Sequence, residues 1–385
     1  MLKNDPLAAK GGELQPKEGD YLPELQLNTT SAPKKKLWLE LVRIFAIYLV
    51  IFNHTGDYGF HYFATIGPGY RYWLFMGAAA LTVMNIPLFY MISGSLLMGK
   101  EESLGTVWKK RIARYALVIV IFTFVQYLWL TLHAEDGFRE SFSLWEWFVT
   151  MLSTNIIVPY WFLYEYLGFL VMLPLYRRMV QNMKEEEFHY LFLLYIIFTG
   201  ALPIVEYLLT RWHTILNISF NIAYITGDLL VYPALGYYLT RKPKPSWKQL
   251  AVLWGLSLLC VIYTCLMTQY KIDAVHQLSE ARVGTFFKTL ICVPAVTVFL
   301  TFRKLFEDHE FHPGVEKLIL SMGSCVFGIY LLEQIGRSVF YDTGMVLVDH
   351  LPNFVATLIY CVIVLLGTYL VVFVLKKIPG LKKLI

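Results

Sequence analysis

Long runs of apolar residues, separated by short charged segments, constrain this chain more than any other feature of its sequence. Hydrophobic residues make up 57% of the 385 residues and charged residues only 16%, with a mean hydropathy of +0.53. Soluble domains have roughly 25% charged residues. Because backbone groups in lipid must bond within the protein, such runs indicate helices. The sequence therefore predicts an all-α polytopic membrane protein.

About ten of these runs approach the length of roughly 20 residues that a helix needs to cross a bilayer. The apolar segment 144–158 is shorter, and it predicts a short or re-entrant helix before the fourth span. The expected spans are about 37–55, 73–98, 112–133, 159–176, 188–208, 221–239, 250–270, 284–301, 318–341 and 354–375.

The positions of the basic residues support this count and predict the topology. With the N-terminus inside, the inner loops and tails hold 25 of the 33 Lys and Arg residues, as expected of cytoplasmic segments. We therefore expect a multi-pass protein of the cell membrane with both termini in the cytoplasm. It would consist of a flexible tail (1–36), a membrane domain (37–375) and a basic tail (376–385).

Ionisable side chains inside the first span are functional candidates, because burying them in lipid costs free energy. Arg43 and His54 lie eleven residues apart, which places them on one helix face about 16 Å from each other. Glu40 lies one turn before Arg43 and can pair with it. This face is expected to point into the bundle. The alternatives are a structural histidine and an arginine that snorkels or pairs within the bundle.

A second basic pair, Arg111 and Arg114, stands one turn apart at the cytoplasmic end of the third span. Two arginines at this spacing can grip a phosphate group through paired hydrogen bonds. The alternative is that they only signal topology, as the neighbouring lysines do.

Several motifs, in order along residues 37–375, resemble those of the acyltransferase family 3 membrane proteins. In this family a histidine is common near the end of the chain, where a glutamate, Glu333, stands here. The matching segments are Arg43 to His54 (R-x10-H), residues 87–94 (PLFYMISG), Arg111 to Arg114 (R-x-x-R), residues 159–165 (PYWFLYE) and residues 328–333 (GIYLLE).

The resemblance implies an integral-membrane O-acyltransferase that uses cytoplasmic acyl-CoA, often acetyl-CoA. The acceptor would be a hydroxyl group, usually on a sugar of an envelope polysaccharide or a glycan precursor. The expected partners are therefore the lipid bilayer, acyl-CoA and an envelope glycan or other hydroxyl acceptor. No metal and no nucleic acid is expected, and a homodimer stays open.

Within this resemblance, each basic residue has an expected role. Arg111 and Arg114 would hold the CoA phosphates, and Arg43 would contact the pantetheine arm or organise Glu40. His54 would act as general base on the acceptor hydroxyl, because imidazole titrates near neutral pH. Direct attack on the thioester and a transient acyl-histidine are both open.

A general base works better when a carboxylate orients it. Asp57, Glu165 and Glu333 are the candidates, and we favour Glu165 because it lies in the fourth-span motif. Glu333, at the family's histidine position, is also a candidate for substrate binding, or for an ion pair with Arg337 one helical turn further along the chain.

Aromatic side chains at the outer end of the fourth span are candidates for the acceptor site. Trp161 and Tyr164 could stack on a sugar ring. The alternative is an ordinary interfacial aromatic belt.

Two other functions stay open at this point. A transporter or exporter of a small polar molecule or glycan precursor would also have about ten spans and buried charges. A membrane-embedded sensor that has lost catalysis is the second. The arginine pair favours the enzyme, since acyl-CoA requires a cytoplasmic phosphate site.

Overall fold

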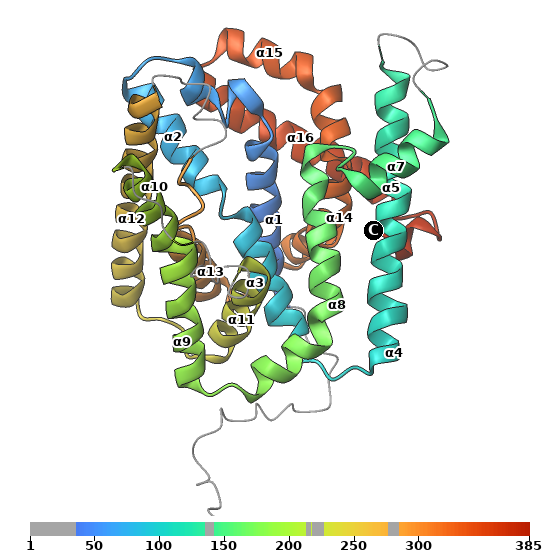
Figure 1. Ribbon diagram of the computed structural model, residues 1–385. Helices are drawn as coiled ribbons and strands as arrows, with labels where there is room; N and C mark the ends of the chain where they lie inside the picture. The colour runs from blue at the N-terminus through green and yellow to red at the C-terminus, as the bar shows by residue number, and fades with distance from the viewer. Residues whose placement is uncertain (1–35, 135–141, 213–216, 218–226, 276–284) are drawn as a thin grey trace, which may run out of the picture.

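The computed structural model describes residues 36–134, 142–212, 217, 227–275 and 285–385. Within these residues the regular structure is entirely helical, without β-strands, as the apolar pattern predicts (Figure 1). The helices run up and down beside one another, and α15 lies across one end of the bundle.

The α-helices vary widely in length, and short 3-10 or π segments interrupt or precede some of them. Their bounds are α1 (Leu37–Asn53), α2 (Tyr70–Thr82), α3 (Asn85–Leu97), α4 (Leu104–Val107), α5 (Ala113–Leu132), α7 (Leu144–Ser153), α8 (Trp161–Asn182), α9 (Glu185–Tyr195), α10 (Leu202–Arg211), α11 (Asp228–Arg241), α12 (Trp247–Val275), α13 (Cys292–Phe306), α14 (Pro313–Val339), α15 (Tyr341–His350) and α16 (Asn353–Leu375).

Seven helical stretches among the described residues are long and apolar enough to cross a membrane. They match seven of the ten expected spans. The other three correspond to α1, α11 and α13, which have 17, 14 and 15 residues. The expected sixth and eighth spans begin in segments outside the described residues. The count of ten and the cytoplasmic termini stay predictions.

The spanning stretch Tyr70–Leu97, which corresponds to the expected span 73–98, is one continuous apolar run in the sequence. The structure divides it into α2 and α3. Pro87 lies in the first turn of α3, where its missing N–H costs no helical hydrogen bond. The break at Val83 and Met84 brings Asn85, which is buried, to the start of α3.

Before the spanning stretch Val158–Asn182, α7 forms a ten-residue helix, and here the sequence predicts a short or re-entrant helix. Its Ser143 N-cap accepts a hydrogen bond from the backbone N–H of Glu146 at 3.2 Å. Trp145 and Leu152 on this helix are strongly exposed. Whether α7 re-enters the membrane stays a prediction.

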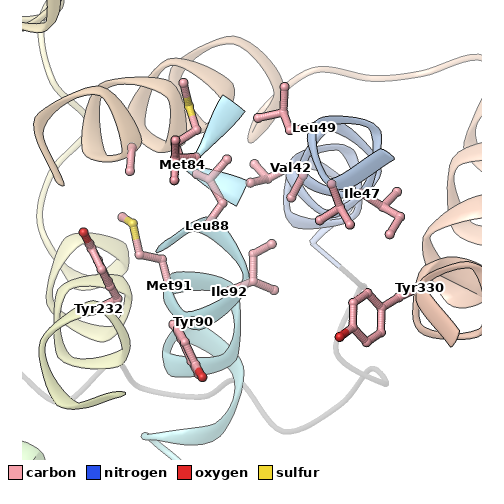
Figure 2. Packing of buried hydrophobic residues seen from close by; sticks show 14 of the residues in the cluster. Val42, Ile47, Leu49, Met84, Leu88, Tyr90, Met91, Ile92, Tyr232 and Tyr330 are labelled. Atoms are coloured by element: carbon pink, nitrogen blue, oxygen red, sulfur yellow. The ribbon is translucent and has the colours of Figure 1, made fainter. Parts of the chain in front are cut away.

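The centre of the bundle is α1, which packs against α3, α13, α14 and α16. Val42, Ala46 and Ile47 on this helix are completely buried. Figure 2 shows Val42 directed toward Leu88 and Ile92 of α3. The face of α1 that carries Arg43 and His54 is therefore held in a fixed position by packing on its other sides.

Helices α3 and α11 approach each other more closely than side chains would permit. A Cβ atom at Gly94 would overlap the carbonyl of Pro233, and one at Gly236 would overlap the carbonyl of Met91. Small residues allow such contact between membrane helices. Gly94 and Gly236 are therefore the positions that allow α3 and α11 to pack main chain against main chain.

Candidate active site

A cavity of about 860 Å³ lies inside the bundle. Its walls come from α1, α3, α5, α8 and α14, together with residues near the C-terminus. Arg43 and His54 both line it, as predicted for one face of the first helix, and so do Arg111 and Arg114. One cavity thus connects the two basic motifs.

His54 ends α1 and contacts a buried carboxylate on α14. Its Nδ1 lies 2.8 Å from Oε1 of Glu333, whose side chain is completely buried. A carboxylate only accepts hydrogen bonds, so the tautomer that suits this contact carries its hydrogen on Nδ1 and has Nε2 as the acceptor. The arrangement can orient His54 as a general base.

Arg337 completes this cluster and ties it to the backbone. Its Nε donates to Oε2 of Glu333 at 2.7 Å, and its Nη1 donates to the backbone carbonyl of His54 at 2.5 Å. Both oxygens of Glu333 therefore have cationic or polar partners, as a buried charge requires. The sequence suggests an ion pair between Glu333 and Arg337, and the structure confirms it.

Helices α8 and α14 are joined beside this cluster. The hydroxyl of Tyr160 donates to the carbonyl of Leu331 at 2.7 Å, and the hydroxyl of Tyr330 donates to the carbonyl of Pro159. These contacts hold the start of α8 against α14 near Glu333, because the acceptor Leu331 precedes Glu333 by two residues.

Deeper in the cavity, Arg43 pairs with Glu40, as their spacing predicts. Nη1 of Arg43 lies 2.5 Å from Oε2 of Glu40. Gly323 on α14 leaves room for this pair, because a Cβ there would overlap the Glu40 carboxylate.

The middle of the cavity has an aromatic wall. Tyr115 and Phe327 stack with ring centroids 5.5 Å apart, and Tyr166 lies 5.2 Å from Tyr115. Tyr115, Tyr166 and Phe327 all line the cavity, so part of its surface between the charged groups is aromatic.

At the other end, Arg111 belongs to a π-helical segment, Trp108–Ile112. Such segments often occur at functional sites. Arg111 donates to both oxygens of Glu102, at 2.8 and 2.7 Å. Arg177 donates to the same carboxylate at 2.7 Å and to the carbonyl of Leu97 at 2.8 Å.

Glu102 lies in the loop before α4, outside the spanning stretches. The hydrogen bonds from Arg111, joined by those from Arg177, lower the pKa of the Glu102 carboxyl to about 2. The carboxylate is therefore fully ionised at neutral pH, and it holds Arg111 in place.

Three further cations border this end of the cavity. Arg114 is exposed and donates to the carbonyl of Leu384 at 3.3 Å. Lys376 donates to the carbonyl of Ser324 at 2.7 Å. Lys110 also lines the cavity. These groups together form a basic mouth, a name used below for Lys110, Arg114 and Lys376 with the fixed Arg111.

A family model described as an acyltransferase domain matches residues 36–373, which is nearly the whole chain. The chain belongs to the acyltransferase 3 family. Searches of curated proteins and of solved structures found no match. The resemblance seen in the sequence is confirmed, and the protein is a membrane acyltransferase by family.

The structure of this acyltransferase does not bring Glu165 to His54, although the sequence favours that pairing. Glu165 faces Tyr90, whose hydroxyl donates to its Oε2 at 3.4 Å. Asp57 is exposed in the 3-10 turn Gly56–Tyr58. Glu333 takes the position beside Nδ1 instead, because α14 packs directly on α1.

The two aromatic candidates of this acyltransferase have different environments. Trp161 lines the cavity, whereas Tyr164 donates its hydroxyl to the carbonyl of Met151 at 2.7 Å. Tyr164 thereby ties α8 to α7. Only Trp161 lies where an acceptor in the cavity could reach it.

Sequence reasoning missed several cavity residues of the acyltransferase. Lys110 and Lys376 are hidden among basic residues that topology already explains. Asn53 gives no signal beyond its place next to His54, and Lys288 is visible only as a charge in an apolar run.

Proposed function

We propose that this protein transfers an acetyl group from cytoplasmic acyl-CoA to a hydroxyl of an envelope carbohydrate or similar extracytoplasmic acceptor. It would do so as a multi-pass protein of the cell membrane. The single observation that carries the proposal is the cavity, which is lined both by His54 and by the basic mouth.

The donor would enter from the basic mouth. Phosphates bind strongly to arginine and lysine side chains, and Arg114, Lys110 and Lys376 are the cations available there. The pantetheine arm would pass the aromatic wall at Tyr115 and Tyr166, so that the thioester reaches His54. Arg43, which lines the same passage, would contact the arm.

The reaction begins when Nε2 of His54 accepts the proton of the acceptor hydroxyl. The oxygen attacks the thioester carbonyl carbon, and the tetrahedral intermediate expels the CoA sulfur as its C–S bond breaks. The imidazolium then gives the proton to the leaving thiolate. Glu333, 2.8 Å from Nδ1, stabilises the imidazolium while it exists.

A covalent route uses the same atoms in two steps. Nε2 attacks the thioester carbonyl carbon, the C–S bond breaks, and CoA leaves as the thiolate, so that an acyl-imidazolium remains. The acceptor oxygen then attacks the acyl carbon, the C–N bond breaks, and the hydroxyl proton passes to the CoA thiolate. Single-turnover acid quench of protein mixed with radiolabelled acetyl-CoA, without acceptor, separates the routes, because only the covalent route leaves label on the protein.

A transporter would also need a cavity, but it would not need a histidine whose Nδ1 is held by a buried carboxylate. That pairing favours acid–base chemistry over passage of a solute.

The test is the release of CoA by purified, detergent-solubilised protein supplied with acetyl-CoA. We expect His54→Ala to lower the rate by about 10²-fold or more, and we expect donor binding to persist. The matched control is His189→Ala, because His189 lies on α9 with Tyr238 as its partner and does not line the cavity. Equal CoA release by wild type and His54→Ala, or no donor binding with acetyl or longer acyl chains, would exclude the proposal.

A further inference from the structure

Lys288 is a positive charge that the proposed reaction has not used. It lies just before α13 and lines the cavity together with His54. Its Nζ lies 5.6 Å from the centre of the Trp161 ring. In the described part of the chain, no carboxylate lies within 4.0 Å of this ammonium group.

The nearest acidic groups are already engaged by tyrosines. Glu165 and Asp228 lie within electrostatic reach of Lys288. Glu165 accepts from Tyr90, and Asp228 accepts from the hydroxyl of Tyr195 at 2.6 Å. These carboxylates balance part of the field of Lys288 but leave its hydrogen-bond donors open toward the cavity.

Two asparagines in the cavity wall have unsatisfied oxygens. Asn85 is only 2% exposed, and its Oδ1 is buried without a hydrogen-bond partner among the described residues. Asn53 precedes His54, and its Oδ1 is likewise buried without a hydrogen-bond partner among the described residues. A buried polar atom without a partner costs free energy. Rotation of either amide toward the cavity would let its oxygen accept a hydrogen bond from a hydroxyl-rich ligand.

Trp161 provides an aromatic surface in the same cavity, beside Lys288. It begins α8 directly after Tyr160, whose hydroxyl bond to Leu331 holds it near the Glu333 turn of α14. A cation beside an indole ring, together with two amides, is a set of groups suited to a sugar ring that carries a negative charge.

We propose that Lys288, Trp161, Asn53 and Asn85 form the acceptor subsite beside His54, and that the acceptor carries an anionic group next to its reacting hydroxyl. The ammonium of Lys288 binds a carboxylate or phosphate, Trp161 contacts the ring, and the amides bind its hydroxyls. This inference rests on the proposed function and names the chemical class of its acceptor.

The experiment compares three acceptors with the full-length protein in detergent and acetyl-CoA as donor. Methyl glucoside is neutral, methyl glucuronide carries a carboxylate, and glucose 1-phosphate carries a phosphate. The measured quantity is the ratio of kcat/KM for each anionic acceptor to that for the neutral one. We expect a preference for at least one anionic acceptor of about ten- to a hundredfold, and which one is preferred identifies the group.

The variants Lys288→Gln and Lys288→Arg test the residue itself. We expect the glutamine variant to lose the preference and the arginine variant to keep it. The matched control is Lys304→Gln. Lys304 lies on α13, the helix that Lys288 precedes, with its Nζ 5.7 Å from the centre of the Trp247 ring of α12, and it does not line the cavity. A preference that survives Lys288→Gln overturns the inference.

Two outcomes separate this inference from the proposed function. CoA release that requires His54 but shows no preference for anionic acceptors overturns the inference alone. If no thioester turnover occurs, the proposed function fails, and equilibrium binding of the same three compounds, followed by tryptophan fluorescence, decides the inference. It then stands only if anionic compounds bind more tightly and Lys288→Gln removes the difference.

Discussion

The two ends of the cavity handle their charges in opposite ways. Around His54, a single buried carboxylate is shared between His54 and Arg337, and the cluster is closed. At the basic mouth, Glu102 engages Arg111 and Arg177, while Arg114 meets only a backbone carbonyl among the described residues. The contacts around His54 fix the orientation of its side chain. At the basic mouth, by contrast, positive charge remains that no described carboxylate neutralises, and it is available for an anionic ligand.

Because of this difference, mutations at the two ends of the cavity should differ in their effect on folding stability. A buried charge pair is expensive to break, because the remaining partner stays desolvated. An exposed arginine can be removed with little effect on folding, since exposed charges contribute little to stability. Changes near His54 should therefore affect the chemical step, and changes at the mouth should affect donor affinity.

The largest effect is expected for Glu333→Gln. The amide keeps the shape but no longer stabilises an imidazolium, so kcat should fall by about 10²-fold or more. The KM for acetyl-CoA should stay within about twofold. Steady-state kinetics of CoA release measures both. Glu146→Gln, on the exposed helix α7, is the control. An unchanged kcat in Glu333→Gln would contradict the assignment of the chemical step to the His54 end of the cavity.

A smaller effect of a different kind is expected at the mouth. Arg114→Ala and Lys376→Gln should each raise the KM for acetyl-CoA by about tenfold, because each removes a charged partner of phosphate, and kcat should change little. Lys377→Gln is the matched control, since Lys377 packs over the Phe373 ring and does not line the cavity. A loss of kcat without a change in KM would contradict this assignment.

The smallest effect concerns Glu102. At pH 7 we expect Glu102→Gln to lower the melting temperature by about 1 °C, the shift that corresponds to about 1 kcal/mol when the unfolding entropy scales with a chain of 385 residues. The folded pKa of about 2 lies below the usual 4.5, so this carboxylate stabilises the fold above pH 4.5 and loses that effect as the pH falls toward 2.

Melting curves of wild type and Glu102→Gln between pH 7 and pH 3 should therefore converge at the acidic end. Glu101→Gln, at the exposed neighbouring position, serves as the control. Curves that diverge further as the pH falls would show that the ion pairs with Arg111 and Arg177 do not stabilise the fold.

The sequence predicts the helical class, the shared face of Arg43 and His54 and the pairing of Arg43 with Glu40 because these depend on local periodicity. The motif pair Arg111 and Arg114 was also recognisable as a candidate from its spacing, and its position on the cavity followed only from the structure.

The partner of His54 could not be predicted in the same way. Which carboxylate reaches Nδ1 depends on how α14 is rotated and shifted against α1, and no local pattern encodes that contact. By chemistry Glu165 and Glu333 are therefore equivalent. The sequence favours Glu165, whereas in the structure Glu333 lies beside Nδ1. Lys376 was obscured for another reason, since basic residues near membrane ends are expected whether or not they bind anything.

The glycine contact between α3 and α11 limits how this protein could adapt to other acyl groups. Because Gly94 and Gly236 bring main chain against main chain, α3 cannot retreat from the passage without separating from α11. Ser93 and Leu97, which α3 contributes to the passage, therefore stand on a fixed wall. Room for a bulkier ligand would therefore come from shorter side chains along the cavity and not from a shift of α3.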